Sequence, residues 1–172
     1  MAIKPILTEP NKLLRQVSKH VEKIGKEEQK LMDDMLETMY SANGIGLAAI
    51  QIGVPKRIIV MDISKDENKR EPRYFVNPVI KNKDNSKSTY EEGCLSVPNQ
   101  FAEIDRPKNC DVEYLDYNGD KKLLNAKGLL ATCIQHEMDH LEGILFIDYL
   151  SKLKKSMIIK KLSKNKSNRI VV

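Results

Sequence analysis

The spacing of apolar residues predicts two helices in the first 141 residues. From Lys26 to Ala42 apolar side chains recur at intervals of three and four, which is the period of one helix face, and Asn43-Gly44 ends the pattern. From Gly128 to Leu141 apolar residues occupy most sides, as expected for a helix buried in the centre of a domain. Gly143 is a suitable stop for this central helix.

A further helix is predicted from about Tyr149 to the polar end of the chain. Its apolar residues form one stripe that should dock on the rest of the protein. The stripe comprises Leu150, Leu153, Met157, Ile158 and Leu162.

Strands dominate the stretch between the helices. Apolar or alternating runs predict strands at residues 57–63, 73–80, 101–104, 110–117 and 121–126. Pro78 should interrupt or end the second run, and Asn118-Gly119 between the last two is a strong hairpin pattern. Since hairpins rather than alternating helices connect the strands, we expect an α+β fold. Mainly antiparallel sheets should pack around the central helix, with one helix towards each terminus.

The length and composition favour one domain with a single sizeable core. The chain has 172 residues and shows neither an internal repeat nor a linker. No apolar run approaches the ~20 residues that span a bilayer, and the N-terminus lacks the apolar region of a signal peptide. We therefore expect a cytoplasmic protein without a membrane segment. Three cysteines, an odd number, argue against a disulfide framework and leave one available as a ligand or nucleophile.

The charge is unevenly distributed. Residues 151–172 carry seven lysines, one arginine and no acid, and taking these eight from the 29 basic residues leaves 21 against 24 acids. The division predicts a catalytic domain at 1–150, with a net charge of −3, and a basic helix and tail at 151–172. A solvated helix docked by its apolar stripe would explain the stripe. Eight cations without an acid suit a polyanion.

Residues 135–143 hold the densest group of chemically active side chains. His136 and His140 are two of only three histidines, and their spacing stacks both rings on one face of a helix. Glu137 lies beside the first ring. This arrangement is typical of metal hydrolases, in which two imidazoles hold a divalent cation and a carboxylate handles the proton of a water. The remaining histidine, His20, lies among charged residues and is expected at the surface.

The positions that supply a third ligand in other proteins with this motif do not supply one here. Phe146 stands six residues after His140, where a third histidine would be required. Glu142 lies on another part of the helix surface than His140. Asp148 could reach the site only if the chain turned back at once.

The third ligand is therefore sought among the cysteines. Cys94 is favoured because a glycine frees the backbone beside it, and a thiolate with two imidazoles can bind a borderline cation and leave a fourth position open. Cys133 lies on the same broad helix face as His136 but one turn early. Cys110 lies in an alternating strand. Both of these are typical of small buried core residues.

Three segments resemble the three motifs of the peptide deformylase family, in order and spacing. They are Gly44-Ile-Gly-Leu-Ala-Ala-Ile-Gln51, Glu92-Gly-Cys-Leu-Ser96 and Gln135-His-Glu-Met-Asp-His140. The resemblance covers nearly the whole chain, and no motif position that carries chemistry is substituted. It implies a metal-dependent hydrolase that removes the formyl group from formyl-methionyl nascent polypeptides and releases formate.

The resemblance also implies a metal site and its base. Cys94, His136 and His140 would ligate the metal, which is ferrous iron (Fe2+) in the family, although zinc, nickel or cobalt can occupy the site. Glu137 would act as general base and then as general acid, and its place on the helical turn leaves it free to carry a proton.

By the same resemblance, the Gln51 side-chain amide and the Leu95 backbone N–H would hold the formyl oxygen. The substrate peptide would align as an added strand, and an apolar pocket would take its first side chain. The residues expected to contact the substrate are Ile45, Gly46, Gly93, Leu129, Thr132 and Cys133. Many relatives have a larger aliphatic residue in place of Thr132, and we expect the pocket to prefer methionine nevertheless.

In relatives that keep a C-terminal helix, that helix contacts the ribosome, so the basic tail is expected to dock there. We expect a monomer. Two competing functions are an endopeptidase with the same motif and an inactive relative that only binds metal or ribosomes. The first lacks its usual third ligand, and the second predicts loss of Glu137 or Gln51, both of which are present.

Two further residues keep more than one interpretation. Glu92 either orients a ligand histidine or forms an ion pair with Arg106. Asp139 is expected to be solvated or salt-bridged rather than a ligand.

Overall fold

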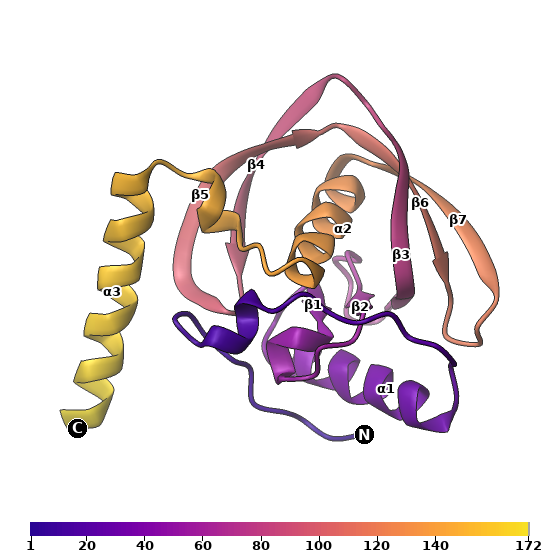
Figure 1. Ribbon diagram of the computed structural model, residues 1–172, viewed down its shortest axis with the longest axis horizontal. Coiled ribbons are helices and arrows are strands. Elements are labelled where there is room, and N and C mark those ends of the chain that lie inside the picture. The colour runs from indigo at the N-terminus through magenta and orange to yellow at the C-terminus, as the bar shows by residue number, and fades with distance from the viewer. Residues whose placement is uncertain (172) are drawn as a thin grey trace.

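Two antiparallel sheets lie around a central helix in the computed structural model, so the predicted α+β class is correct (Figure 1). The structure describes the main chain of residues 1–171 and the side chains of residues 1–164. The helices are η1 (Lys12–Arg15), α1 (Lys26–Ser41), η2 (Ala49–Ile52), α2 (Gly128–Leu141), η3 (Phe146–Tyr149) and α3 (Lys152–Val171), where η denotes a 3-10 helix. The strands are β1 (Gly46–Ala48), β2 (Ile58–Met61), β3 (Arg73–Lys83), β4 (Lys87–Cys94), β5 (Val97–Pro107), β6 (Asn109–Leu115) and β7 (Lys121–Lys127).

The larger sheet has the strand order β1-β2-β3-β6-β7, and β4 and β5 form a separate hairpin. Every pair of neighbouring strands is antiparallel. Figure 1 shows α2 between the β4–β5 hairpin and the strands β3, β6 and β7, with α1 below it. The predicted Asn118-Gly119 hairpin joins β6 to β7.

Strand β2 links two cores because its two faces are both covered. Its four side chains are fully buried and alternate between the faces of the sheet. Ile59 and Met61 pack in the cluster that includes α2, whereas Ile58 and Val60 pack with the methionines of α1. This part of the sheet is therefore held between α1 and α2, and it gives α2 a rigid support.

The β4–β5 hairpin is longer than the sequence predicted. The only expected strand there was 101–104, but β4 and β5 together cover 19 residues. Residues 87–94 are mostly polar because one face of β4 meets solvent, so no apolar run marks the strand. Strand β3 continues past Pro78, and a register shift between Val76 and Val79 accommodates the proline.

The central helix is as buried as predicted, with nine of its 14 residues buried. It ends at Leu141, and Gly143 follows with a φ of +73°. A β-carbon at Gly143 would lie 2.4 Å from the Arg15 carbonyl oxygen, so only glycine fits both this conformation and this contact.

The C-terminal helix α3 docks by only part of its predicted stripe. Leu150, Ile158 and Leu162 pack against β5 and η3. Leu153 and Met157 are 71% and 51% exposed, so their assignment to the docked stripe was wrong. The reason is that α3 lies beside β5 along one edge of the rest of the protein (Figure 1), which covers only one side of the helix. The exposure of Leu153 and Met157 places them on the uncovered side. Within the described residues, no helix is both long and apolar enough to cross a membrane.

Candidate active site

The two histidines of the central motif lie side by side on α2, as their spacing predicted. Their ring centroids are 5.1 Å apart in an edge-on arrangement, and both residues are buried. Helix α2 is held against the sheet by its apolar faces, so the two imidazoles are fixed before any ligand binds. Burial and the neighbouring His136 lower the pKa of His140 well below its usual value, which keeps its ring neutral and able to donate a lone pair.

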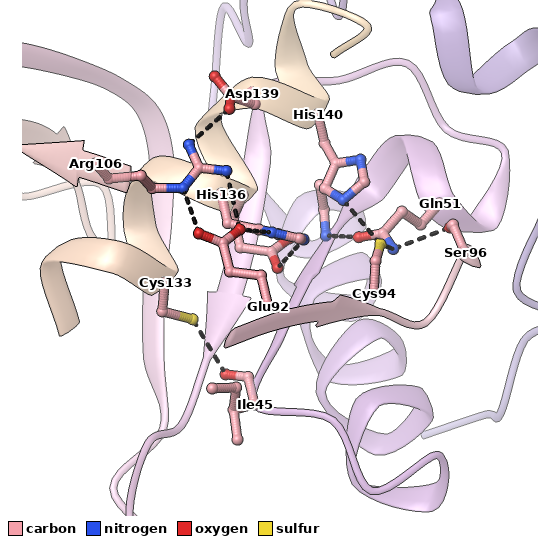
Figure 2. Close-up of polar contacts among 12 residues, drawn as sticks. Ile45, Gln51, Glu92, Cys94, Ser96, Arg106, Cys133, His136, Asp139 and His140 are labelled. Atoms are coloured by element: carbon pink, nitrogen blue, oxygen red, sulfur yellow. Dashed lines mark hydrogen bonds and ion pairs between the residues drawn. The ribbon is translucent and has the colours of Figure 1, made fainter. Parts of the chain in front are cut away.

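The β4–β5 hairpin brings Cys94 to these histidines. Cys94 is the last residue of β4, and its Sγ lies 3.3 Å from His140 Nε2 (Figure 2). One ligand atom from each of Cys94, His136 and His140 falls within 4.8 Å of the others. A thiolate with two imidazoles suits Fe2+ or Zn2+ and leaves room for another ligand, so the donor set fits the expected cation.

The acids after α2 take no part in this group. Glu142 binds the Arg57 guanidinium at 2.7 Å, and Asp148 binds that of Arg15 at 2.6 Å. Cys110 is buried in the sheet core, and Cys133 lies with its Sγ 3.9 Å from the Ile45 carbonyl oxygen. Of the three cysteines, only Cys94 joins the histidines among the described residues.

Both interpretations of Glu92 hold at once. Its carboxylate accepts from His136 Nδ1 at 2.8 Å, and from Arg106 Nε and an Arg106 terminal nitrogen at 2.6 and 3.0 Å (Figure 2). Arg106 also binds Asp139 at 2.8 Å, so Asp139 is salt-bridged as expected. Burial raises the pKa of Glu92, but the bonds to His136 and Arg106 outweigh it and lower that pKa below its usual value. An ionised carboxylate only accepts hydrogen bonds, so His136 Nδ1 carries a proton. Nε2 is then the ring atom that could donate a lone pair to a cation.

The site attracts positive charge to His136. Burial lowers the pKa of this ring, but Cys94 and Glu92 outweigh it and raise the pKa well above its usual value. The same neighbours that favour a proton on the ring would also favour a cation beside it. The electrostatics therefore fit a bound metal as well as the donor types do.

Glu137 is a buried carboxylate beside the ligands. Its Oε1 lies 3.9 Å from His136 Nε2, and its Oε2 has no hydrogen-bond partner among the described side chains. Burial raises the pKa of Glu137 to about 7 in the cation-free chain. A β-carbon at Gly46 would lie 2.7 Å from Glu137 Oε1, so this glycine makes room for the carboxylate. A group of this pKa, uncommitted and next to a cation site, is suited to proton transfer.

Gln51 reaches the site from η2, on the side away from Glu92 (Figure 2). Its Oε1 accepts from the Ala48 N–H at 2.9 Å, and its Nε2 donates to Ser96 Oγ at 3.0 Å. The same Nε2 lies 3.6 Å from Cys94 Sγ, so the amide faces the ligand group. Leu95, in the turn between β4 and β5, lines the same cleft.

A cleft of about 490 Å³ opens onto these groups. It lies between the free edges of β1 and β4, and α2 forms its floor. The structure places every predicted substrate contact on its wall, namely Ile45, Gly46, Gly93, Leu129, Thr132 and Cys133. The cleft is lined partly by apolar side chains and partly by polar groups, as small-molecule and peptide sites usually are.

Sequence reasoning missed two residues that the structure brings to the site. Phe101 lines the cleft and is 64% exposed. Its ring lies against Gly93, and a β-carbon on Gly93 would be 2.5 Å from that ring. Its pairing with Gly93 across the hairpin could not be found without the full extent of β5. Ser96 is completely buried, and its contact with Gln51 joins residues 45 positions apart.

Comparison with known proteins identifies the family. The polypeptide deformylase family model matches residues 3–156. The peptide deformylase of Pelagibacter ubique (strain HTCC1062) is 81% identical over 172 residues, which is all of both chains. That of Rhizobium meliloti (strain 1021) is 53% identical, over 98% of this chain and 97% of its own.

Solved structures agree with this family in both sequence and fold. The crystal structure of peptide deformylase from Ehrlichia chaffeensis has a TM-score of 0.91 and 42% identity, and the match covers 96% of this chain and 97% of that one. A second structure of that protein, in complex with actinonin, has a TM-score of 0.90 and 46% identity, over 96% of this chain and 98% of that one. The chain therefore belongs to the peptide deformylase family.

Proposed function

We propose that the cleft beside α2 is where this deformylase removes the formyl group from formyl-methionyl nascent polypeptides. We assign Cys94, His136 and His140 as the ligands of the metal on which the family depends. The observation that carries the proposal is the convergence of these ligand atoms within 4.8 Å, beside a buried carboxylate whose Oε2 has no hydrogen-bond partner among the described residues. The bound cation supplies a Lewis acid that makes water nucleophilic near neutral pH. We infer Fe2+ in the cell, with zinc, nickel or cobalt as alternatives.

Glu137 is assigned the proton transfer. Its carboxylate takes a proton from the attacking water and delivers it to the departing nitrogen as the C–N bond breaks. The products are formate and a peptide with a free N-terminal amine. Burial raises the pKa of Glu137 above its usual value, and this direction supports both halves of the task, because the carboxylate then accepts a proton more readily and can still release it.

Gln51 and Leu95 are assigned to the formyl oxygen. Attack on the formamide builds negative charge on this oxygen, and the Gln51 amide and the Leu95 backbone N–H are the donors we propose for it. Losing one such donor typically costs ~3 kcal/mol of transition-state stabilisation. The position of the Gln51 amide, 3.6 Å from Cys94 Sγ, supports this assignment.

The substrate peptide is assigned to the gap between two free strand edges. Main-chain groups of Ile45, Gly46 and Gly93 line this gap and would pair with an extended peptide. The methionine side chain would enter the part of the cleft formed by α2. Its contacts there are Leu129, Thr132 and Cys133.

The test is formate release by anaerobically prepared, nickel- or iron-loaded protein acting on formyl-Met-Ala-Ser. We expect formate from the wild type and a loss of at least 100-fold in Glu137→Gln, which keeps the shape of the side chain but cannot carry the proton. Glu142→Gln is the matched control: this exposed carboxylate at the end of the same helix binds only Arg57 among the side chains that the structure describes. Equal activity of Glu137→Gln and wild type would reject the assignment.

We further propose that the basic helix and tail, residues 151–172, act as a docking element separate from the catalytic domain, residues 1–150. The exposed lysines of α3, together with the exposed Leu153 and Met157, support docking on the ribosome. The side chains of Lys166 and Arg169 lie outside the described residues. Lys154→Glu/Lys161→Glu should weaken co-sedimentation with ribosomes at low salt, while Lys69→Glu/Lys122→Glu, which alters two exposed lysines elsewhere, should not. Equal loss in both variants would reject a specific role of α3.

We also propose a monomer that works in the cytoplasm, where nascent chains are made. All the assigned ligands and the proton carrier come from one chain, which supports a site that needs no second copy. Sedimentation equilibrium at micromolar concentration tests the monomer, and a mass near twice 19.7 kDa would overturn it.

A further inference from the structure

We infer that Ser96 is a positioning residue for the Gln51 amide, and that its hydroxyl determines where the second N–H of that amide points. The inference rests on the role proposed for Gln51 at the formyl oxygen. It assigns Ser96 no contact with the substrate. The Ser96 hydroxyl, in the two-residue turn after β4, orients the Gln51 side chain on η2.

The Gln51 side chain is fixed by contacts at both ends of its amide. Its Oε1 accepts from the Ala48 N–H at 2.9 Å, which establishes which end is oxygen and which is nitrogen. Its Nε2 donates to Ser96 Oγ at 3.0 Å. The two N–H bonds of an amide lie in one plane at about 120°, so fixing one by Ser96 fixes the direction of the other.

The second N–H then faces the active site. Gln51 Nε2 also donates to Cys94 Sγ at 3.6 Å (Figure 2), and Gln51 and Cys94 both line the cleft. Without the Ser96 hydroxyl, the Ala48 N–H and the longer contact to Cys94 Sγ would hold the amide less tightly, and its last torsion would range more widely because such sp3–sp2 torsions are broad. The donor would then spend part of its time away from the formyl oxygen.

The surroundings of Ser96 are rigid enough for this task. The residue is completely buried, and it follows Leu95 in the tight turn that pairs Cys94 with Val97. The N-terminal segment also bridges the two halves of the site. The Leu7 N–H donates to the Gln51 carbonyl at 2.7 Å, and the Glu9 N–H donates to the Ser96 carbonyl at 2.8 Å.

The two bridging donors lie two residues apart in the N-terminal segment. This one segment therefore holds the main chains of Gln51 and Ser96 together. Main-chain hydrogen bonds therefore keep the Gln51 and Ser96 main chains at a fixed separation. The bond from Gln51 Nε2 to the Ser96 hydroxyl then sets the orientation of the Gln51 amide.

The test is a double-mutant cycle on the nickel-loaded full chain with formyl-Met-Ala-Ser. Ser96→Ala should lower kcat about tenfold with KM changed less than twofold, because an oxyanion donor acts in the transition state. In a Gln51→Ala background, Ser96→Ala should lower kcat less than twofold further. Ser18→Ala is the matched control: Ser18 is also a buried serine, and its hydroxyl has no hydrogen-bond partner among the described residues.

The outcomes separate this inference from the proposed function. Equal losses from Ser96→Ala in both backgrounds would show a general structural effect and overturn the inference, as would an unchanged kcat when Gln51→Ala is impaired. Full activity of Gln51→Ala would overturn the proposed role of Gln51 and this inference together.

The wild-type protein provides a second measurement that does not depend on a folded variant. The Gln51 side-chain amide should have an NMR order parameter near that of rigid backbone, about 0.85, and a value below about 0.6 would overturn the inference.

Discussion

Replacing Glu92 by glutamine tests how the metal site is supported. The carboxylate accepts three hydrogen bonds, at 2.6 and 3.0 Å from Arg106 and at 2.8 Å from His136. A glutamine of the same shape retains one acceptor oxygen and turns an NH2 group towards the donors. Breaking a buried ion pair by removing one partner costs about 3–5 kcal/mol. Since Arg106 retains Asp139, we expect the lower end, about 3 kcal/mol of unfolding free energy.

Two measurements check this expectation. In thermal unfolding, about 3 kcal/mol corresponds to a fall in Tm of about 6–12 °C for a chain of this size. In chelator competition with cobalt-loaded protein, metal affinity should fall about 10–100-fold, because His136 loses the carboxylate that orients it. Glu91→Gln is the matched control, since Glu91 is the exposed neighbour on the same strand.

A double variant distinguishes charge pairing from loss of shape. Glu92→Gln/Arg106→Met no longer buries a guanidinium without its main partner, so it should unfold at a higher temperature than Glu92→Gln alone. The reasoning is refuted if Glu92→Gln matches Glu91→Gln in both Tm and metal affinity. It is also refuted if the double variant is less stable than the single one by a further 3 kcal/mol or so, because the two residues would then act independently.

Three further predictions concern stability and specificity. Burial raises the pKa of Asp148, but its bond to Arg15 outweighs burial and leaves that pKa below its usual value. The ionised carboxylate therefore stabilises the fold at neutral pH, and this stabilisation is lost as pH falls through the folded-state pKa. Asp148→Asn should flatten the acid side of a plot of unfolding free energy against pH, and an unchanged slope would contradict this prediction. Gly143→Ala should lower the unfolding free energy measured in urea by more than about 2 kcal/mol, because the φ of Gly143 is +73° and a β-carbon there would lie 2.4 Å from the Arg15 carbonyl oxygen. Gly25→Ala is the control and should lower it by less than about 1 kcal/mol, because the nearest atom to a β-carbon there is 3.6 Å away. Thr132→Val should raise the unfolding free energy by about 1 kcal/mol and lower KM for formyl-Met peptides. The reason is that the Thr132 hydroxyl is buried and has no hydrogen-bond partner among the described residues. A wild-type preference for a polar first residue would contradict this account of the pocket.

Local patterns predicted the elements whose bonds are local. The period of apolar residues located α1 and α2 to within a residue or so, because a helix satisfies its main chain by bonds four positions apart. The pairing of His136 with His140 follows from the same geometry and needs no knowledge of the fold. The Asn118-Gly119 hairpin is likewise a short-range feature.

Patterns failed where burial depends on a distant neighbour. The polar strand β4 has no apolar run, since its order comes from pairing with β5. Leu153 and Met157 share the helical spacing of the docked residues of α3, yet they remain exposed because the body covers only one edge of that helix. The period of apolar residues describes one helix or strand and does not show how much of its surface the rest of the chain covers.

The residue spacing alone is enough to put two imidazoles and a carboxylate on one helix, and chemical elimination favoured Cys94 as the third ligand. The folded chain is needed to show that Cys94 Sγ lies 3.3 Å from the His140 ring, 46 positions later in the chain, and that Glu92 binds both His136 and Arg106. It also placed Ser96 against Gln51. The physical reason is that contacts between distant segments form only when the packing of the whole core offsets the entropy of closing long loops, and no short stretch of residues encodes that sum.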